Sequence, residues 1–137
     1  MNSSLNESLQ LARRVLIDTL SVQNYVEGRV YTSHFIDYDK KTTPMPLIIL
    51  EYEGGRANYS MKSQRAIMRV YAYSSQSSSE AGAIYDAAYS NLNAKVLKHS
   101  SIDIAGYCYE LTRPVSGFNE AVKGWFYRGT FILNTAG

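Results

Sequence analysis

The residues that most often carry out chemistry are few and scattered in this sequence. The two histidines, His34 and His99, lie far apart, and neither has a second histidine or cysteine three or four residues away. Asp37 and Asp39 follow His34 closely and can hold a cation weakly, but such a polar segment is more typical of a solvated loop. We therefore expect no metal site.

A nucleophile needs a neighbouring base and an orienting group, and no motif in the sequence supplies them. The G-x-S-x-G elbow is absent. Cys108 lies inside a predicted strand, where a small buried thiol is the usual finding. Gly54 and Gly55 lack the P-loop pattern, and a turn is enough to explain them. We expect no catalytic activity and no cofactor; a small enzyme with a site that the sequence does not reveal stays an alternative.

One predicted strand, Gln64 to Ser74, places cations and aromatic rings on one face. Its two faces alternate as Ala66, Met68, Val70 and Ala72 against Arg65, Ile67, Arg69, Tyr71 and Tyr73. Arginines beside rings are also found where single-stranded nucleic acids stack on a sheet. The net charge is only +2, the charges are interspersed, and no RNP motif is present. We favour a face that meets solvent or protein and keep a small nucleic-acid-binding module as an alternative.

The composition indicates one globular domain spanning residues 1–137. Hydrophobic residues make up 45% of the chain, which is ordinary for a globular protein. A single cysteine allows no intrachain disulfide and favours a reducing cytosol. The N-terminus lacks the pattern of a signal peptide, and the longest apolar run, Pro44 to Leu50, is too short for a membrane helix. Twelve tyrosines, each with an apolar ring and a polar tip, favour protein interfaces.

Hydrophobic periodicity in the first half of the chain predicts one helix and two strands. A helix from Ser4 to Leu20 begins with capping-box spacing at Ser4 and Glu7 and lines one face with leucine and alanine. A turn over Asn24 to Gly28 leads to a short strand, Arg29 to Ser33. Leu47 to Tyr52 is a continuous apolar run that predicts a central strand, and Gly54 to Lys62 follows as a flexible loop or a hairpin crossing.

The second half predicts three strands and one helix. After the strand at Gln64 to Ser74, Ser77 and Glu80 repeat the capping-box spacing and open a helix that runs to about Leu97, with Val96 on its apolar stripe. Two strands, Ile104 to Pro114 and Trp125 to Asn134, are joined by a long hairpin loop from Pro114 to Gly124. The fold class is α+β, a largely antiparallel sheet of about five strands covered by two helices, in the order α-β-β-β-α-β-β.

Several segments in this order resemble one phage family. They are Leu9 to Leu20 with Gly28-Arg29-Val30-Tyr31; Pro44 to Leu50 leading to Gly54-Gly55; Arg69 to Ser74 with Glu80-Ala81 opening a helix that ends near Asn91-Leu92; and Trp125 to Phe131. Together they resemble the tail-terminator, or tail-to-head joining, proteins of long-tailed bacteriophages. The resemblance covers nearly the whole chain, and the tyrosine richness and the Asp37 to Thr43 segment depart from it.

The resemblance implies a structural virion protein without catalytic residues. Six copies are expected to form a ring that caps the tail tube, stops its polymerisation and joins it to the head connector. The partners are then other copies of the chain, the tail tube protein and the head–tail connector protein, and DNA passes through the ring without specific binding. Assembly takes place in the cytoplasm of the bacterial host. A head-completion or connector protein of the neck stays an alternative.

Loops that project from a rigid sheet are the natural contact points of such a ring. We expect the polar segments Asp37 to Thr43, Arg56 to Ser63 and Ser116 to Lys123 to supply these contacts. The candidate contact residues are Tyr38, Asp39, Lys40, Lys41, Arg56, Tyr59, Lys62, Arg65, Phe118, Asn119 and Lys123.

Overall fold

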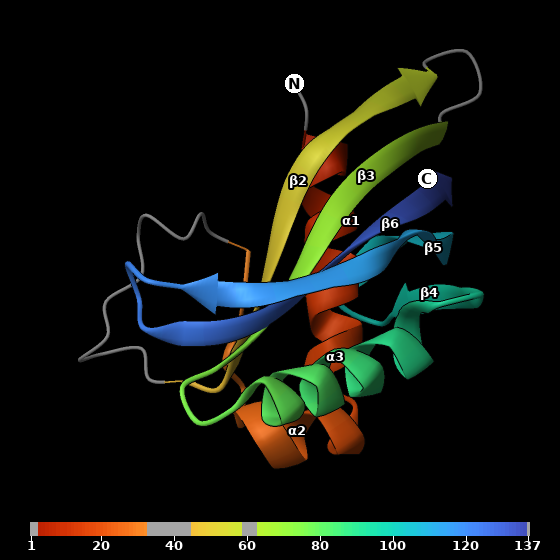
Figure 1. Ribbon diagram of the computed structural model, residues 1–137. Coiled ribbons are helices and arrows are strands. Elements are labelled where there is room, and N and C mark those ends of the chain that lie inside the picture. The colour runs from red at the N-terminus through yellow and green to blue at the C-terminus, as the bar shows by residue number, and fades with distance from the viewer. Residues whose placement is uncertain (1–2, 33–44, 59–62, 137) are drawn as a thin grey trace.

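The computed structural model describes residues 3–32, 45–58 and 63–136, which form a mixed sheet with helices on it (Figure 1). The elements are α1 (Ser3–Ile17), α2 (Leu20–Val26), β1 (Val30–Tyr31), β2 (Leu47–Asn58), β3 (Ser63–Ser74), α3 (Ser78–Leu92), β4 (Lys95–His99), β5 (Ile102–Asn119) and β6 (Gly124–Ala136). The strand order is β1-β2-β3-β6-β5-β4, with β1 parallel to β2 and all other neighbours antiparallel. The α+β class is confirmed, but the expected five strands and two helices are wrong, because α2 and β4 were not foreseen.

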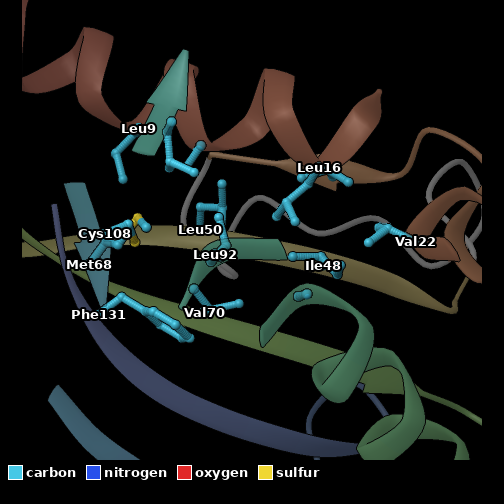
Figure 2. Close-up of a cluster of buried hydrophobic side chains, with 14 of the residues drawn as sticks. Leu9, Leu16, Val22, Ile48, Leu50, Met68, Val70, Leu92, Cys108 and Phe131 are labelled. Atoms are coloured by element: carbon cyan, nitrogen blue, oxygen red, sulfur yellow. The ribbon is translucent and has the colours of Figure 1, made fainter. Parts of the chain in front are cut away.

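The three helices pack on one face of the sheet and share one core with it (Figure 2). Leu9 and Leu16 of α1 point towards the sheet, where they meet side chains from α3 and from the strands. The strands contribute Ile48 and Leu50 of β2, Met68 and Val70 of β3, Cys108 of β5, and Phe131 and Leu133 of β6. Burial of these side chains supplies the main free energy of folding.

The other face of the sheet carries a second, smaller cluster. Leu47 and Ile49 of β2 pack there with Tyr73 of β3. Because Ile48 and Leu50 lie in the main core, all four residues of this apolar run are buried, as expected for a strand covered on both sides. The alternation predicted for β3 is confirmed, since Ala66, Met68, Val70 and Ala72 are buried on the helix side.

The predicted helix from Ser4 to Leu20 is wrong at its end, because the chain breaks into two helices. Thr19 has an extended backbone between α1 and α2. At the break, the Leu16 carbonyl still has a hydrogen-bond donor, because the side-chain amide of Gln23 donates to it over 3.1 Å. Leu20 is therefore 75% exposed instead of lying on the apolar stripe. The expected turn over Asn24 to Gly28 is helical up to Val26. Within the predicted strand, β1 covers Val30–Tyr31, and Ser33 lies outside the described residues.

The helix α3 starts as predicted and ends earlier. Ser77 is its N-cap and accepts a hydrogen bond from the Glu80 amide over 3.0 Å, whereas the Glu80 carboxylate binds the Ser74 hydroxyl instead of closing a full capping box. The helix stops at Leu92 and Ala94 adopts φ 57°. The residues up to Leu97, expected to be helical, enter the edge strand β4.

The strands β2 and β5 extend into segments that were expected to be loops. The pairing of β2 with β3 continues to Asn58, and Gly54 follows a β-bulge. A loop that begins at Gly54 is therefore wrong, whereas the alternative of a hairpin crossing agrees with the antiparallel pair; residues 59–62 lie outside the described residues. Likewise β5 runs on from Pro114 to Asn119, and the predicted long hairpin loop shrinks to a tight turn before Gly124. Cross-strand pairing with β3 and β6 overrides the local glycine and proline signals.

The outer edge of β5 is interrupted along its second half. In the described residues, β4 pairs with β5 only as far as Cys108. Beyond Cys108, the backbone amide of Glu110 donates its hydrogen bond to the Asn93 side chain over 2.8 Å instead of to a strand. Pro114 has no amide hydrogen to offer, and the register against β6 shifts twice between Glu110 and Val115.

Candidate interaction surface

The candidate contact residues fall into three groups in the structure. Tyr38, Asp39, Lys40, Lys41, Tyr59 and Lys62 lie outside the described residues. Arg56 and Arg65 are register partners on β2 and β3, so the expectation that Arg56 lies in a loop is wrong. Phe118, Asn119 and Lys123 lie at the β5–β6 turn, where Lys123 has φ 55°.

The structure does not bring these groups together. Arg65 pairs with Asn134 of β6, whereas Phe118 pairs with Trp125 at the other end of the same strand. At about 3.3 Å per residue, these two positions on β6 are roughly 30 Å apart. Arg65 and Phe118 therefore cannot belong to one compact site within a single copy.

The register of β3 and β6 places several charged and aromatic side chains on the face opposite the helices. Tyr71 pairs with Arg128, and Tyr73 pairs with Phe126. Arg128 of β6 lies on the opposite side of the sheet from the core residue Phe131, and the pairing of β3 with β6 sets it beside Tyr71.

This face is hollowed into a pocket of about 600 Å³. Its floor comes from β2, β3 and β6, and its rim from the β5–β6 turn. The lining residues are Ile49, Glu51, Arg69, Tyr71, Tyr73, Phe118, Asn119, Glu120, Ala121, Phe126 and Arg128. Phe118 and Asn119 are the two candidate residues that the structure places in a defined hollow. Glu51, Arg69 and Arg128 were not among the candidates, because only pairing across three strands brings them together.

Tyr73 anchors the aromatic side of the pocket. Its ring stacks on Tyr71 with centroids 5.8 Å apart and planes 10° apart, and the Phe126 ring lies 5.7 Å away. Burial raises the pKa of the Tyr73 hydroxyl, while its hydrogen bond with the Asn119 side chain works in the opposite direction. The phenol therefore stays protonated at neutral pH and ties the β5–β6 turn to the sheet.

The same contacts argue against a nucleic-acid platform. Tyr71 and Tyr73 stack on each other, so Tyr73, only 2% exposed, offers no open ring to a base. The Arg69 guanidinium lies 3.7 Å from the Glu51 carboxylate, which neutralises its charge. Single-strand binding depends on exposed rings and unpaired cations, and Arg69, Tyr71 and Tyr73 of β3 provide little of either, whereas Arg65 is exposed.

Exposed apolar side chains gather along β5 and at the start of β6. Leu111 and Val115 are each 49% exposed. Phe118 and Trp125 are each 38% exposed and meet edge to face, with centroids 4.8 Å apart. Scattered exposed apolar residues are normal, but several on one hairpin are typical of an interaction surface.

A second hollow of about 310 Å³ lies between α3 and β5. On its wall, the Tyr85 hydroxyl donates a hydrogen bond to the Glu110 carboxylate over 2.6 Å. Burial, and then this hydrogen bond, raise the pKa of Tyr85. Asp86 and Arg113 complete the polar part of the lining. The hydrogen bond between Tyr85 and Glu110 links α3 to β5.

Within the described ranges, no three histidine, cysteine, aspartate or glutamate side chains lie close enough together to hold a metal ion. His34, Asp37 and Asp39 lie outside those ranges. Cys108 is fully buried, and burial raises the pKa of its thiol to about 12, so it remains a protonated thiol. Among the helices described, none is long and apolar enough to cross a bilayer.

The sequence matches no known protein family, and no curated protein matches it either. A similar fold does occur among solved structures. A chain from a structure titled "Virion of native gene transfer agent (GTA) particle" superposes with a TM-score of 0.64 at 13% sequence identity, and the match covers 92% of each chain. At this identity, the likeness shows a shared fold.

Proposed function

We propose that this chain is a structural virion protein of the tail-terminator kind. In this role, a hexameric ring of the protein caps the tail tube, ends its polymerisation and joins it to the head connector. The observation that carries the proposal is the fold shared over 92% of both chains with a chain of a gene transfer agent virion. The order of sequence segments that resembles tail terminators favours this position in the particle.

The surface of the chain supports such a role. A subunit of a closed ring needs two different patches, because each copy meets its neighbours through unlike surfaces. The hollowed sheet face, with Phe118 in its lining, and the exposed side chains of Leu111 and Val115 on β5 are candidates for these two patches. The role requires no reaction centre, and we propose that the chain acts through surface complementarity alone.

A deletion experiment tests the proposal. Particles are produced from a genome that lacks the coding sequence of this chain, and they are examined by electron microscopy. We expect tail tubes of uncontrolled length and unattached heads, and rescue when the intact chain is supplied from a plasmid. Joined particles of normal length would overturn the proposal. Tails of normal length beside heads that fail to join would instead point to the neck alternative, a head-completion or connector protein.

A second measurement concerns the ring itself. The native mass of the purified protein, alone and with tail tubes, is determined by light scattering, and the assemblies are imaged in negative stain. We expect closed rings at one end of each tube, with six subunits. Binding along the sides of tubes, or none, would contradict the proposed position.

A further inference from the structure

Arg128 is the one pocket cation whose charge is not matched within the described residues. The Arg69 and Glu51 side chains pair over 3.7 Å, and Glu120 pairs with Lys123 over 3.5 Å. No hydrogen bond or ion pair joins the Arg128 guanidinium to another described residue. The lining is formally neutral, with two arginines and two glutamates, but each glutamate has its nearest cation elsewhere, and Arg128 is left without an ion-pair partner among the described residues.

The surroundings of Arg128 are aromatic and apolar. Tyr71 lies beside it across the β3–β6 pairing, and Tyr71, Tyr73 and Phe126 form the adjoining wall, with ring centroids 5.7 to 6.4 Å apart. A guanidinium presents a planar pair of donors that fits a carboxylate. Aromatic rings next to it provide contact area for an apolar side chain.

The size of the pocket indicates how much of a ligand it holds. Its volume of about 600 Å³ is far larger than a bare ion needs and lies within the range of ordinary ligand pockets, roughly 300 to 1,000 Å³. A few residues of an extended peptide fit such a space. A nucleic acid fits it less well, because its binding depends on several phosphate contacts, and of the two arginines in the lining Arg69 is paired with Glu51.

We propose that this pocket binds a short segment of a partner protein in which a carboxylate follows an aromatic or large apolar side chain. The carboxylate lies on Arg128, and the apolar side chain packs against Tyr71 and Phe126. The assignment of the occupant to a partner protein in the particle rests on the proposed function. Its combination of a carboxylate and an apolar side chain is inferred from the pocket itself.

Two matched peptides test the proposal on the wild-type protein. N-acetyl-Phe-Asp-amide and N-acetyl-Phe-Asn-amide have the same shape and differ in charge. Each is titrated into ¹⁵N-labelled protein, and amide shifts are followed by NMR. We expect the aspartate peptide to move the signals of Tyr71, Phe126 and Arg128 and to bind about tenfold more tightly than the asparagine peptide, a difference of about 1.4 kcal/mol.

The variant Arg128→Gln removes the charge and keeps a polar side chain of similar length. We expect it to bind both peptides equally, while the control Arg113→Gln, on the other hollow, retains the preference. Thermal unfolding of each variant checks that the fold is kept. Equal binding of the two peptides to the wild type overturns the proposal without any variant, as does the absence of shifts at about 10 mM peptide. Binding of an oligothymidylate in place of either peptide also overturns it.

This outcome is separable from that of the proposed function. If deletion of the chain leaves tails normal while the charge preference holds, the virion role fails and the pocket stands. If tails are capped normally by the chain but the preference is absent, the pocket proposal alone fails.

Discussion

The hydroxyl oxygen of Tyr85 lies 1.7 Å from the position that a Cβ atom would occupy on Gly129. Because Gly129 has no side chain, the aromatic ring of Tyr85 on α3 lies directly on β6, and its hydroxyl reaches Glu110 of β5. Tyr85 thus connects the helix to two strands.

Gly129→Ala is expected to lower the free energy of unfolding by about 3 kcal/mol, the upper part of the range for overpacked cores. The added Cβ also meets Tyr85 Cζ at 2.6 Å, so the whole ring must move. Urea denaturation followed by circular dichroism measures the loss. Gly124→Ala is the matched control, because its Cβ meets the flexible end of Met45, which can move aside. Equal losses in the two variants would refute the explanation.

The stability of the protein is expected to fall as the pH rises above about 10. Burial raises the pKa of Tyr73 and of Tyr85 in the folded chain, whereas in the unfolded chain both phenols lose their protons near pH 10. Above that pH the folded state holds more protons, so the free energy of unfolding decreases with pH; below it, the contribution is constant. Urea denaturation at about pH 9 and pH 11 shows the difference. The double variant Tyr73→Phe and Tyr85→Phe should flatten the slope, and an unchanged slope would contradict the assignment.

Cys108 is expected to react with a thiol reagent only when the protein unfolds. Its side chain is fully buried, and its pKa of about 12 leaves almost no thiolate at neutral pH. Absorbance after addition of Ellman's reagent, with and without urea, gives the two rates. Cys108→Ser should cost about 1 to 3 kcal/mol of stability because it buries a hydroxyl, and Cys108→Ala should cost less. Rapid labelling of the folded protein would show that the core opens here.

Trp125 is the only tryptophan of the chain, and its fluorescence is expected to report assembly. It is 38% exposed and lies at the hairpin that we place in an interface. On ring formation its emission should shift to shorter wavelength, because water leaves its surroundings. Trp125→Phe should weaken assembly at unchanged monomer stability, while Leu20→Ser, on an exposed residue of α2, serves as control. Rings that form with no spectral shift would place the hairpin outside the contacts.

Local sequence patterns predicted the parts of the fold whose conformation is determined mainly by residues close together in the sequence. The alternation of β3 and the N-cap at Ser77 are of this kind, and both are confirmed. The strand β4 is different. Val96 fits the apolar stripe of a helix, yet it is 68% exposed on an edge strand, because the chain reverses at Ala94 to pair with β5.

Prediction from the sequence is limited in the same way for the residues that line the pocket. Phe118 and Asn119 were predicted as contacts from their place near a turn, and they do line the hollow. Its charged members, Glu51, Arg69 and Arg128, come from three different strands, and their proximity depends on register between segments far apart in the chain. No spacing in the sequence encodes that register.

The interrupted edge of β5 has a consequence for how copies can join. With the Glu110 amide already bonded to Asn93 and with Pro114 in the strand, the border of β5 between these two residues is a poor template for a further strand. This disfavours open-ended, fibre-like stacking of copies along this stretch. Contacts made here would instead depend on side chains, whose geometry can close an assembly of fixed size.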